Sequence, residues 1–308
     1  MALHRLTSIT LGVPNVAETA AYYAAFGLTP TGAGTRFATR DGGEQLRIVE
    51  APIRRLVELG VGVDDADDLH RIAANLNRLD IVFSTEPNAL RALDPNSNLL
   101  VVLQIAAHLE QAPAEQVPYN GPGRPSRANG RAPGVEREDV VRPRKLGHVV
   151  IGSRDQEASQ RFFTEGLGFA VSDQVPGLAS FLRCSTDHHN ILVQRAPVDF
   201  LHHTAWEVDD VDEVGRGATA MLEGHPERHV WGLGRHHIGS NFFWYLKDPA
   251  GNFSEYYSDL DCIVDDALWK PSVVSGARGL YSWGPPVPPS FLNPEDLAAL
   301  MTDAHSAR

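Results

Sequence analysis

The strongest constraint on the fold is an internal repeat that spans most of the chain. Four segments of the first half match four segments of the second half in pattern: 6–13 with 146–153, 45–52 with 190–197, 54–69 with 199–214, and 93–105 with 246–258. In the first pair, LTSITLGV and LGHVVIGS are both short strand-like runs followed by a helix-start signal. Matches in the same order over about 100 residues of each half predict two similar domains.

Each domain also looks doubled internally. The runs LGHVVIGS and LHHTAWEV both begin as strands, and each is followed by one helix and then by further strands. The first helix of each domain is expected to start after Asn15 and Ser153, and to end near Gly27 and Gly166. The repeating unit is therefore a βαβββ module used four times, which predicts an α+β fold of two tandem domains.

Changes in composition predict the domain limits. Residues 107–145 are rich in Pro, Gly, Arg and Glu, which is typical of an irregular connection, and they separate a first domain (1–106) from a second (146–261). A C-terminal extension, 262–308, is Pro-rich and is expected to wrap the surface before a short helix at 294–301.

Charge and hydropathy exclude several classes of function. The formal net charge is −12 and no dense Lys/Arg cluster occurs, so a nucleic-acid partner is not expected. No apolar run approaches the roughly 20 residues that span a bilayer, so no membrane association is expected. The start, MALHRLTSIT, does not resemble a signal peptide, and the two cysteines, Cys184 and Cys262, suit a reducing compartment. These features favour a cytoplasmic protein.

The repeat provides an internal comparison for the polar residues. Four of them in the second half have no chemical equivalent in the first half: His148 aligns with Ser8, His203 with Glu58, Glu255 with Val101, and His189 with Glu44. Residues needed only for the fold should occur in both halves. The difference therefore favours a functional site in the second domain alone.

Two histidines and one carboxylate point to a metal. His148 and His203 occupy matching places in successive modules, so pseudo-symmetry brings them together on facing strands, and Glu255 lies on the last strand of the same unit. Three such ligands on one face leave positions open, as in mononuclear non-haem Fe(II) oxygenases, and Mn(II) suits the same set. In each adjacent pair, His202-His203 and His188-His189, strand alternation predicts that one member faces outward.

Three motifs carry a family resemblance. KLGHVVIGS, FLHHTAWEV and DPAGNFSEYY resemble the metal-binding motifs of the type I extradiol (meta-cleaving) catechol dioxygenases, in the vicinal oxygen chelate superfamily. The resemblance implies the metal ligands His148, His203 and Glu255, an acid/base His189, and two further active-site residues, His236 and Tyr245. His188 could exchange with His189, and His237 with His236.

The resemblance also implies the architecture and the reaction. Each domain is expected to form a curved, partly open mixed β-barrel with helices outside, and the chain is expected to form a homo-oligomer. The implied reaction is Fe(II)-dependent insertion of both atoms of O2 into a catechol, giving a hydroxymuconic semialdehyde-type product. Homoprotocatechuate-type members use an arginine shortly before the counterpart of His236, whereas here the residue five positions earlier is Trp231 and Arg228 is further off, so an apolar or differently substituted catechol is favoured.

The pocket walls and two other functions complete the expectations. The candidates for the pocket walls are aromatic residues: Trp206, Phe242, Phe243 and Trp244. The alternatives are a glyoxalase-like isomerase or thiol transferase, and a non-enzymatic small-molecule-binding protein of the superfamily. A site shared between the domains, as in glyoxalase-like enzymes, is disfavoured because Ser8 and Val101 cannot supply ligands.

Overall fold

The first half of the chain forms two βαβββ modules. The structure is a computed structural model that describes residues 3–32, 34–272, 274 and 279–306, with side chains up to residue 301. The elements of this half are β1 (Leu3–Val13), α1 (Val16–Ala25), β2 (Thr29–Thr31), β3 (Arg36–Thr39), β4 (Gly43–Glu50), β5 (Arg55–Val63), α2 (Ala66–Arg78), β6 (Phe83–Glu86), β7 (Ala89–Leu93) and β8 (Leu100–Ile105). Strand β1 pairs with both β4 and β5, so it joins the two modules at the middle of the sheet.

The second half repeats this order. Its elements are β9 (Lys145–Ser153), α4 (Gln156–Arg161), the π-helical turn η1 (Phe162–Leu167), β10 (Ala170–Val175), β11 (Ala179–Arg183), β12 (Ile191–Arg195), β13 (Phe200–Glu207), α5 (Val211–Leu222), the 3-10 turn η2 (Pro226–Arg228), β14 (His229–Arg235), β15 (Phe242–Lys247) and β16 (Phe253–Ser258). Strand β9 again lies in the middle, between β12 and β13.

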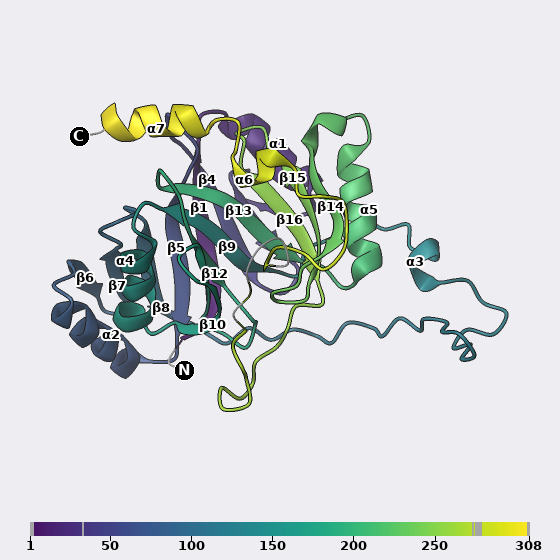
Figure 1. Cartoon of the computed structure of the whole chain (residues 1–308), viewed down its shortest axis with the longest axis horizontal. Helices are drawn as coiled ribbons and strands as arrows, with labels where there is room; N and C mark the ends of the chain where they lie inside the picture. The colour runs from purple at the N-terminus through teal and green to yellow at the C-terminus, as the bar shows by residue number, and fades with distance from the viewer. Residues whose placement is uncertain (1–2, 33, 273, 275–278, 307–308) are drawn as a thin grey trace.

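The two sheets have corresponding topologies (Figure 1). The first has the strand order β2-β3-β4-β1-β5-β8-β7-β6 and the second the order β10-β11-β12-β9-β13-β16-β15-β14. Both are mixed and neither closes on itself, with helices packed on the outside. The predicted α+β class, with two modules in each of two partly open units, is confirmed.

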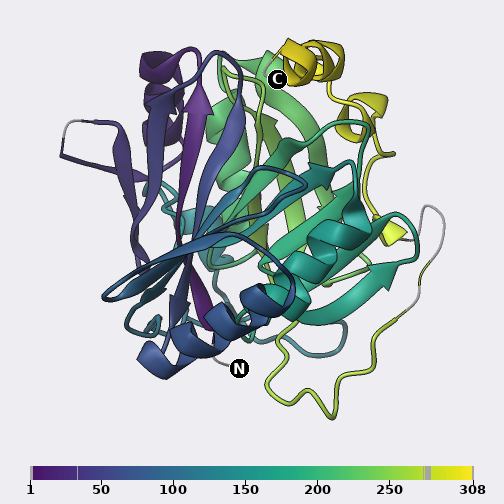
Figure 2. The same ribbon diagram turned by 90° about the vertical axis from the view of Figure 1, so that its left-hand side faces the viewer.

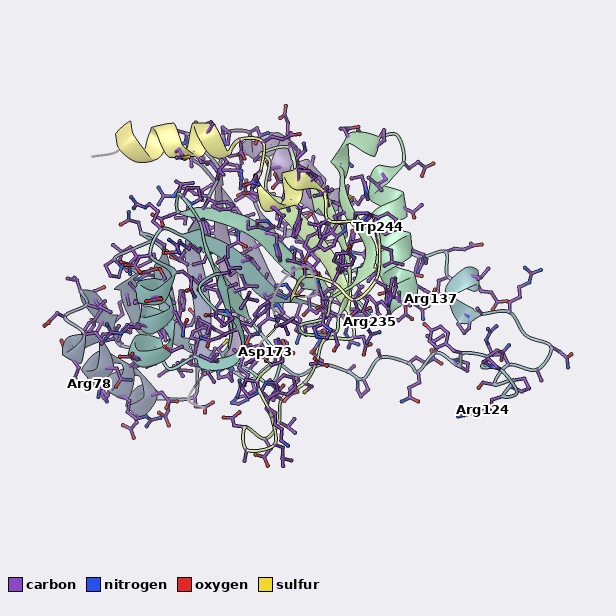
Figure 3. The ribbon with its side chains drawn as sticks, viewed as in Figure 1. Arg78, Arg124, Arg137, Asp173, Arg235 and Trp244 are labelled. Atoms are coloured by element: carbon purple, nitrogen blue, oxygen red, sulfur yellow. The ribbon has the colours of Figure 1, made fainter. Side chains whose placement is uncertain are left out.

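The connection between the halves runs out from the body of the molecule. Its one helix in the described residues is the single turn α3 (Pro133–Glu136), and Arg124 lies far from both sheets (Figure 3). The extension after β16 contains α6 (Pro289–Leu292) and α7 (Leu297–Ser306), so the predicted helix at 294–301 starts three residues too early. No helix in the described residues is long and apolar enough to cross a membrane. The domain limits and the homo-oligomer stay predictions.

The helix of the second domain differs from its prediction at both ends. The N-cap of α4 is Asp155, whose side chain accepts a hydrogen bond from the Ala158 N–H, whereas Ser153 is still part of β9. The helical segment ends at Leu167 and is capped by Gly168, in the left-handed conformation with φ of 93°, just past the predicted end near Gly166. The π-helical turn carries the chain past Gly166 before it reverses.

The two halves lie side by side (Figure 2), and they pack through contacts between α1 and β16. The hydroxyl groups of Tyr22 and Ser254 are 2.5 Å apart, and the rings of Phe26 and Tyr256 stack with centroids 3.9 Å apart. Because side chains alternate along β16, these contacts turn Ser254 and Tyr256 toward the first half and Glu255 toward the opposite face. The domain interface therefore orients a buried carboxylate.

Candidate active site

Strand register places the predicted residues in one row across the second sheet. His148 on β9 pairs with Ala205 on β13, Ala205 pairs with Glu255 on β16, and Glu255 pairs with Tyr245 on β15. Paired residues in adjacent strands point to the same face. The small Ala205 therefore lies between the imidazole and the carboxylate and leaves space above it.

A β-bulge brings the second histidine to the same place. Leu201 pairs with Ile151 and His203 with the preceding residue, Val150, so His202 is the extra residue in β13. A bulge interrupts the alternation of side chains and often re-aims one beside an active site. Both His202 and His203 are buried. The prediction that one member of this pair faces outward is wrong for that reason.

The three predicted ligands converge. The Nε2 atom of His148 is 3.2 Å from Oε2 of Glu255, and Nε2 of His203 is 3.4 Å from the same oxygen. Two ligand atoms about 2.1 Å from one metal ion and at right angles to each other lie about 3 Å apart. His203 Nε2 is buried without a hydrogen-bond partner among the described residues, and Glu255 is 0% exposed. An orphaned nitrogen beside a buried carboxylate fits a bound cation.

Asn241 is a site residue that the sequence pattern did not reveal. Its side-chain N–H donates to Oε1 of Glu255 over 3.1 Å, and Asn241 itself is 1% exposed. The bond holds the carboxylate with its other oxygen toward His148 and His203. A single asparagine before an aromatic strand carries no recognisable motif, so only the structure identifies it.

The structure distinguishes His236 from His237. His236 Nε2 lies 2.8 Å from the Tyr245 hydroxyl and 3.9 Å from Oε1 of Glu255, whereas His237 is exposed and its Nδ1 is 3.4 Å from Oγ of Ser282. His236 is thus the member of the pair at the predicted site. Burial raises the pKa of Tyr245 well above its ordinary value, so the phenol keeps its proton at neutral pH.

His189 lies beside His148, with ring centroids 4.2 Å apart. Its Nδ1 is 3.0 Å from Nδ1 of His188, and Nε2 of His188 is 3.0 Å from Oδ2 of Asp173. A carboxylate accepts, so His188 donates to Asp173 through Nε2, and in the neutral imidazole that tautomer leaves Nδ1 to accept from His189. Burial, then repulsion from His148, lowers the pKa of His189 well below its ordinary value. Both members of this pair are buried, so neither faces solvent, but only His189 lines the cavity.

The pair at the bulge repeats this pattern with a different outer partner. The Nδ1 atoms of His202 and His203 are 2.8 Å apart, and Nε2 of His202 is 2.7 Å from the backbone oxygen of Phe291. Burial lowers the pKa of His202 to about 4, so the ring is neutral near pH 7. It therefore donates to Phe291 through Nε2 and accepts from His203 through Nδ1. The remaining nitrogen of His203, Nε2, faces Glu255 without a proton.

A narrow cavity of about 70 Å³ opens beside these groups. Its apolar walls come from both modules and from the C-terminal extension: Val150, Phe181, Leu192, Ile238, Leu280 and Phe291. None of the four predicted wall residues lines it. Trp206 instead packs against Tyr23 at the domain interface, and Trp244 bonds His229 on the outer face (Figure 3). Adjacent residues of a strand face opposite sides, which separates Trp206 and Trp244 from the site. Phe243 faces the site but stacks on His236, with centroids 4.0 Å apart, and does not line the cavity.

The corresponding place in the first half holds an ion pair. Glu58 lies where His203 does, and it accepts a hydrogen bond over 3.3 Å from Arg91, which takes the place of Tyr245. The structure pairs Gly60 with Val102 as it pairs Ala205 with Glu255. The counterpart of Glu255 is therefore Val102 and not Val101, because the turn before β8 is one residue longer than the turn before β16.

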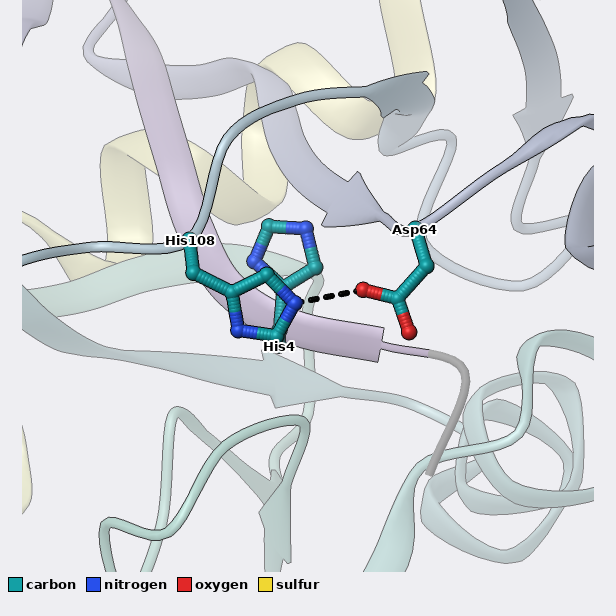
Figure 4. A group of neighbouring side chains, drawn as sticks. All are labelled: His4, Asp64 and His108. Carbon is teal, nitrogen blue, oxygen red and sulfur yellow. Dashed lines mark hydrogen bonds and ion pairs between the residues drawn. The ribbon is translucent and has the colours of Figure 1, made fainter.

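A second group of ligand-type side chains lies at the other end of the first sheet. His4, Asp64 and His108 come together where β1 begins and where β5 and β8 end (Figure 4). His108 Nε2 is 2.5 Å from Oδ1 of Asp64, with side chains 68% and 45% exposed, and the two imidazoles stack with centroids 4.2 Å apart. Exposed ion pairs of this kind are common. The buried His148 group is the better candidate for a metal centre.

Comparisons with known proteins agree with this arrangement. Residues 145–256 match the model of the Glyoxalase/Bleomycin resistance protein/Dioxygenase superfamily. The chain is 31% identical to Metapyrocatechase 2 of Cupriavidus necator over 94% of this chain and 92% of that protein. It is 30% identical to an iron-dependent extradiol dioxygenase of Rhodococcus jostii (strain RHA1), over 45% of this chain and 50% of that protein.

A solved structure shares the whole architecture. The Mn(II)-bound glyoxalase of Novosphingobium aromaticivorans superposes with a TM-score of 0.75 and 25% identity, over 94% of both chains. The fold, the buried His-His-Glu group and the match along nearly the full length of a metapyrocatechase lead to one assignment. The chain belongs to the type I extradiol dioxygenases of the vicinal oxygen chelate superfamily, and it is a ring-cleaving dioxygenase.

Proposed function

We propose that the enzyme uses Fe(II) to open an uncharged catechol beside one of its hydroxyl groups, and that it releases a hydroxymuconic semialdehyde-type product. The observation that carries this proposal is the position of His189, His236 and Tyr245, which line the same cavity as the ligand-type residues His148 and His203. A metal-binding protein without catalytic activity would not need them there.

His148, His203 and Glu255 would hold the metal ion. When bound, the ion would supply Lewis-acid polarisation of the two diol oxygens and a template that brings O2 beside the ring. A set of two histidines and one carboxylate would leave positions open for the substrates. Iron is proposed because two histidines and one carboxylate are typical of Fe(II) oxygenases, and Mn(II) is the second candidate.

Tyr245 and His236 would orient the diol. The Tyr245 hydroxyl keeps its proton because burial raises its pKa, so it donates either to His236 Nε2 or to a substrate oxygen. Since His236 Nδ1 already faces the oxygen of Leu280, its Nε2 is the nitrogen available to the substrate. His236 Nε2 would then accept from a diol hydroxyl, and the Tyr245 hydroxyl, as a donor fixed in advance at one diol oxygen, would favour the ionised form of that oxygen.

His189 would move the proton. Burial keeps its ring neutral, and the bond to His188 leaves Nε2 without a proton, so Nε2 accepts a proton from the diol and returns it when the ring opens. The outer bond from His188 to Asp173 holds this tautomer.

The lining of the cavity supports a catechol without an acidic substituent. The described residues that line it include no Arg or Lys. Trp231, five positions before His236, is 1% exposed and stacks on Tyr245 with centroids 5.8 Å apart. A buried carboxylate without a cationic partner is costly, so a charged catechol would bind weakly.

The test is anaerobic reconstitution with Fe(II), or with Mn(II), followed by addition of O2 and of catechols in parallel. Catechol, 3-methylcatechol, 2,3-dihydroxybiphenyl and 3,4-dihydroxyphenylacetate form the panel. We expect a yellow product and one O2 consumed per diol with the uncharged members, and a much lower kcat/KM with 3,4-dihydroxyphenylacetate. No O2 uptake with any diol would refute the proposal.

The name of the Novosphingobium structure makes glyoxalase chemistry the second candidate. The first half of the chain argues against glyoxalase chemistry that uses ligands from both domains. The places of the three ligands are taken there by Ser8, Glu58 and Val102, and Glu58 accepts a hydrogen bond from Arg91. The hemithioacetal of methylglyoxal and glutathione therefore belongs in the same assay. Its conversion by the Mn(II) form, with the catechols untouched, would favour the second candidate.

A further inference from the structure

The C-terminal extension reaches the candidate metal centre at two points. The backbone oxygen of Leu280 lies 2.5 Å from His236 Nδ1, and that of Phe291 lies 2.7 Å from His202 Nε2. Both residues also line the cavity. The superfamily match ends at residue 256, so these contacts come from a part of the chain that lies outside the shared core.

A carbonyl oxygen can only accept a hydrogen bond, which fixes where the imidazole protons are. His236 must carry its proton on Nδ1, and His202 must carry its proton on Nε2. The bare Nδ1 of His202 then requires a proton on Nδ1 of His203, 2.8 Å away. Both site histidines are thereby held with Nε2 unprotonated, the form in which His203 can bind a metal.

We propose that the extension acts as a clamp: it sets the tautomers of His203, through His202, and of His236, and so prepares the centre for its metal. The proposal rests on the proposed metal site. His202 is a positioning residue in this scheme, because it acts through His203 and is not itself a ligand. The extension contributes backbone oxygens, so sequence motifs cannot reveal its role.

An arginine of the first domain anchors the clamp. Arg54 has a side chain only 2% exposed, and its Nε and Nη2 lie 2.5 and 2.9 Å from the carboxylate of Asp296. Its Nη1 donates over 2.6 Å to the oxygen of Leu201, directly before the bulge at His202. One guanidinium group thus joins the extension to the strand that carries His203. This gives the first domain a role at the site although it supplies no predicted ligand.

Aromatic packing holds the same segment. The Phe291 ring lies edge-to-face on His202, with centroids 4.7 Å apart, and 4.7 Å from the ring of Tyr245. Trp231 donates from its indole nitrogen to the oxygen of Pro285 over 2.8 Å. The segment is thus fixed before Phe291, at Pro285, and after it, at Asp296, and these contacts keep the Phe291 oxygen beside His202.

The test compares His202→Phe with His202→Gln in the full-length, metal-free protein. Phenylalanine keeps the ring but cannot accept from His203, whereas the glutamine amide can accept from His203 and donate to Phe291. Binding of Mn(II) is measured under nitrogen from the signal of free Mn(II) in electron paramagnetic resonance. We expect about a 10- to 100-fold higher Kd for His202→Phe, and a Kd closer to wild type for His202→Gln.

The second readout is the tautomer itself. Nitrogen-15 NMR of histidine-labelled, metal-free protein is expected to show His203 protonated on Nδ1 in the wild type and to lose that state in His202→Phe. A folded His202→Phe protein with the wild-type Kd and the wild-type His203 tautomer would overturn the proposal. If His202→Phe altered metal binding but the wild type turned over no catechol, the proposed function would be refuted and the proposal of the clamp would be supported.

A second pair of variants keeps the test decisive if His202→Phe does not fold. Asp296→Asn removes the charge that pairs with Arg54, and Glu295→Gln removes the neighbouring charge, which pairs with Lys247 over 3.3 Å and has a side chain 78% exposed. We expect Asp296→Asn to raise the Kd for Mn(II) several-fold and Glu295→Gln to leave it unchanged. Equal Kd values for the two variants would contradict the anchoring role of Arg54.

Discussion

Asn241→Ala tests whether a neutral side chain that is not a ligand holds the carboxylate of the proposed metal site. Oε2 of Glu255 faces the two histidines, and Oε1 receives its hydrogen bond from Asn241 over 3.1 Å. His236 Nε2 is 3.9 Å from Oε1, too far to replace that bond. The substitution therefore removes the hydrogen bond to Oε1 of a carboxylate that is 0% exposed.

The expected loss follows from the charge and the burial. A hydrogen bond to a charged group contributes about 1.5–3 kcal/mol, and each 1.4 kcal/mol changes an equilibrium constant tenfold. Freed from Asn241, the Glu255 carboxylate can rotate away from the position in which Oε2 meets the metal. We therefore expect metal binding to weaken by about 10- to 100-fold, the range usual for partners of metal ligands.

The assay is anaerobic titration of the metal-free protein with Mn(II) in competition with a chelator. Asn77→Ala is the matched control, because Asn77 is exposed on α2, away from the site. It should bind Mn(II) as the wild type does. If Asn241→Ala, folded by circular dichroism, also bound Mn(II) within twofold of the wild type, then Asn241 would not position Glu255.

Three further outcomes are expected. His203→Ala should lose the bound metal, measured by elemental analysis after gel filtration, whereas His108→Ala should keep it; metal retained by His203→Ala would refute the ligand assignment. Burial lowers the pKa of His202 to about 4 in the folded protein, against 6.5 in the unfolded chain, so the unfolded chain binds the proton first as the pH falls. The free energy of unfolding of the metal-free protein, measured with urea, should therefore fall by about 2 kcal/mol more between pH 7 and pH 5 than that of His202→Phe. Equal pH slopes for the two proteins would contradict this. Tyr22→Phe should leave Ser254 Oγ unpaired and cost about 1–3 kcal/mol in the same assay, and an unchanged midpoint would show that this interdomain bond contributes nothing.

The sequence alone predicted the repeat, the α+β class and the set of polar residues that meet in the second half. It could do so because the two halves can be compared with each other. Where one half has Ser8 or Glu58 and the other has a histidine at the matching position, the histidine is not needed for packing alone. Period-two alternation then placed His148 and Glu255 on one face, and the pairing of both with Ala205 agrees with that placement.

The same rule failed where the backbone departs from a regular strand. The bulge at His202 and the loop at His188 bury both members of each histidine pair, and no local pattern signals either departure. The predicted pocket walls failed for a related reason. Aromatic residues such as Trp206 had two possible destinations, the cavity or the domain interface, and the packing of the first domain decided between them.

Residue identity and spacing determined which groups are available to a metal, because ligand chemistry and strand periodicity are local properties of the chain. Only the tertiary structure decided how those groups are held. The bond from His202 to Phe291 joins residues 89 positions apart through a backbone oxygen, and the bond from Arg54 to Asp296 spans 242 positions. A backbone oxygen is the same in every residue, so its position beside a histidine follows from the fold of the whole chain and from no motif within it.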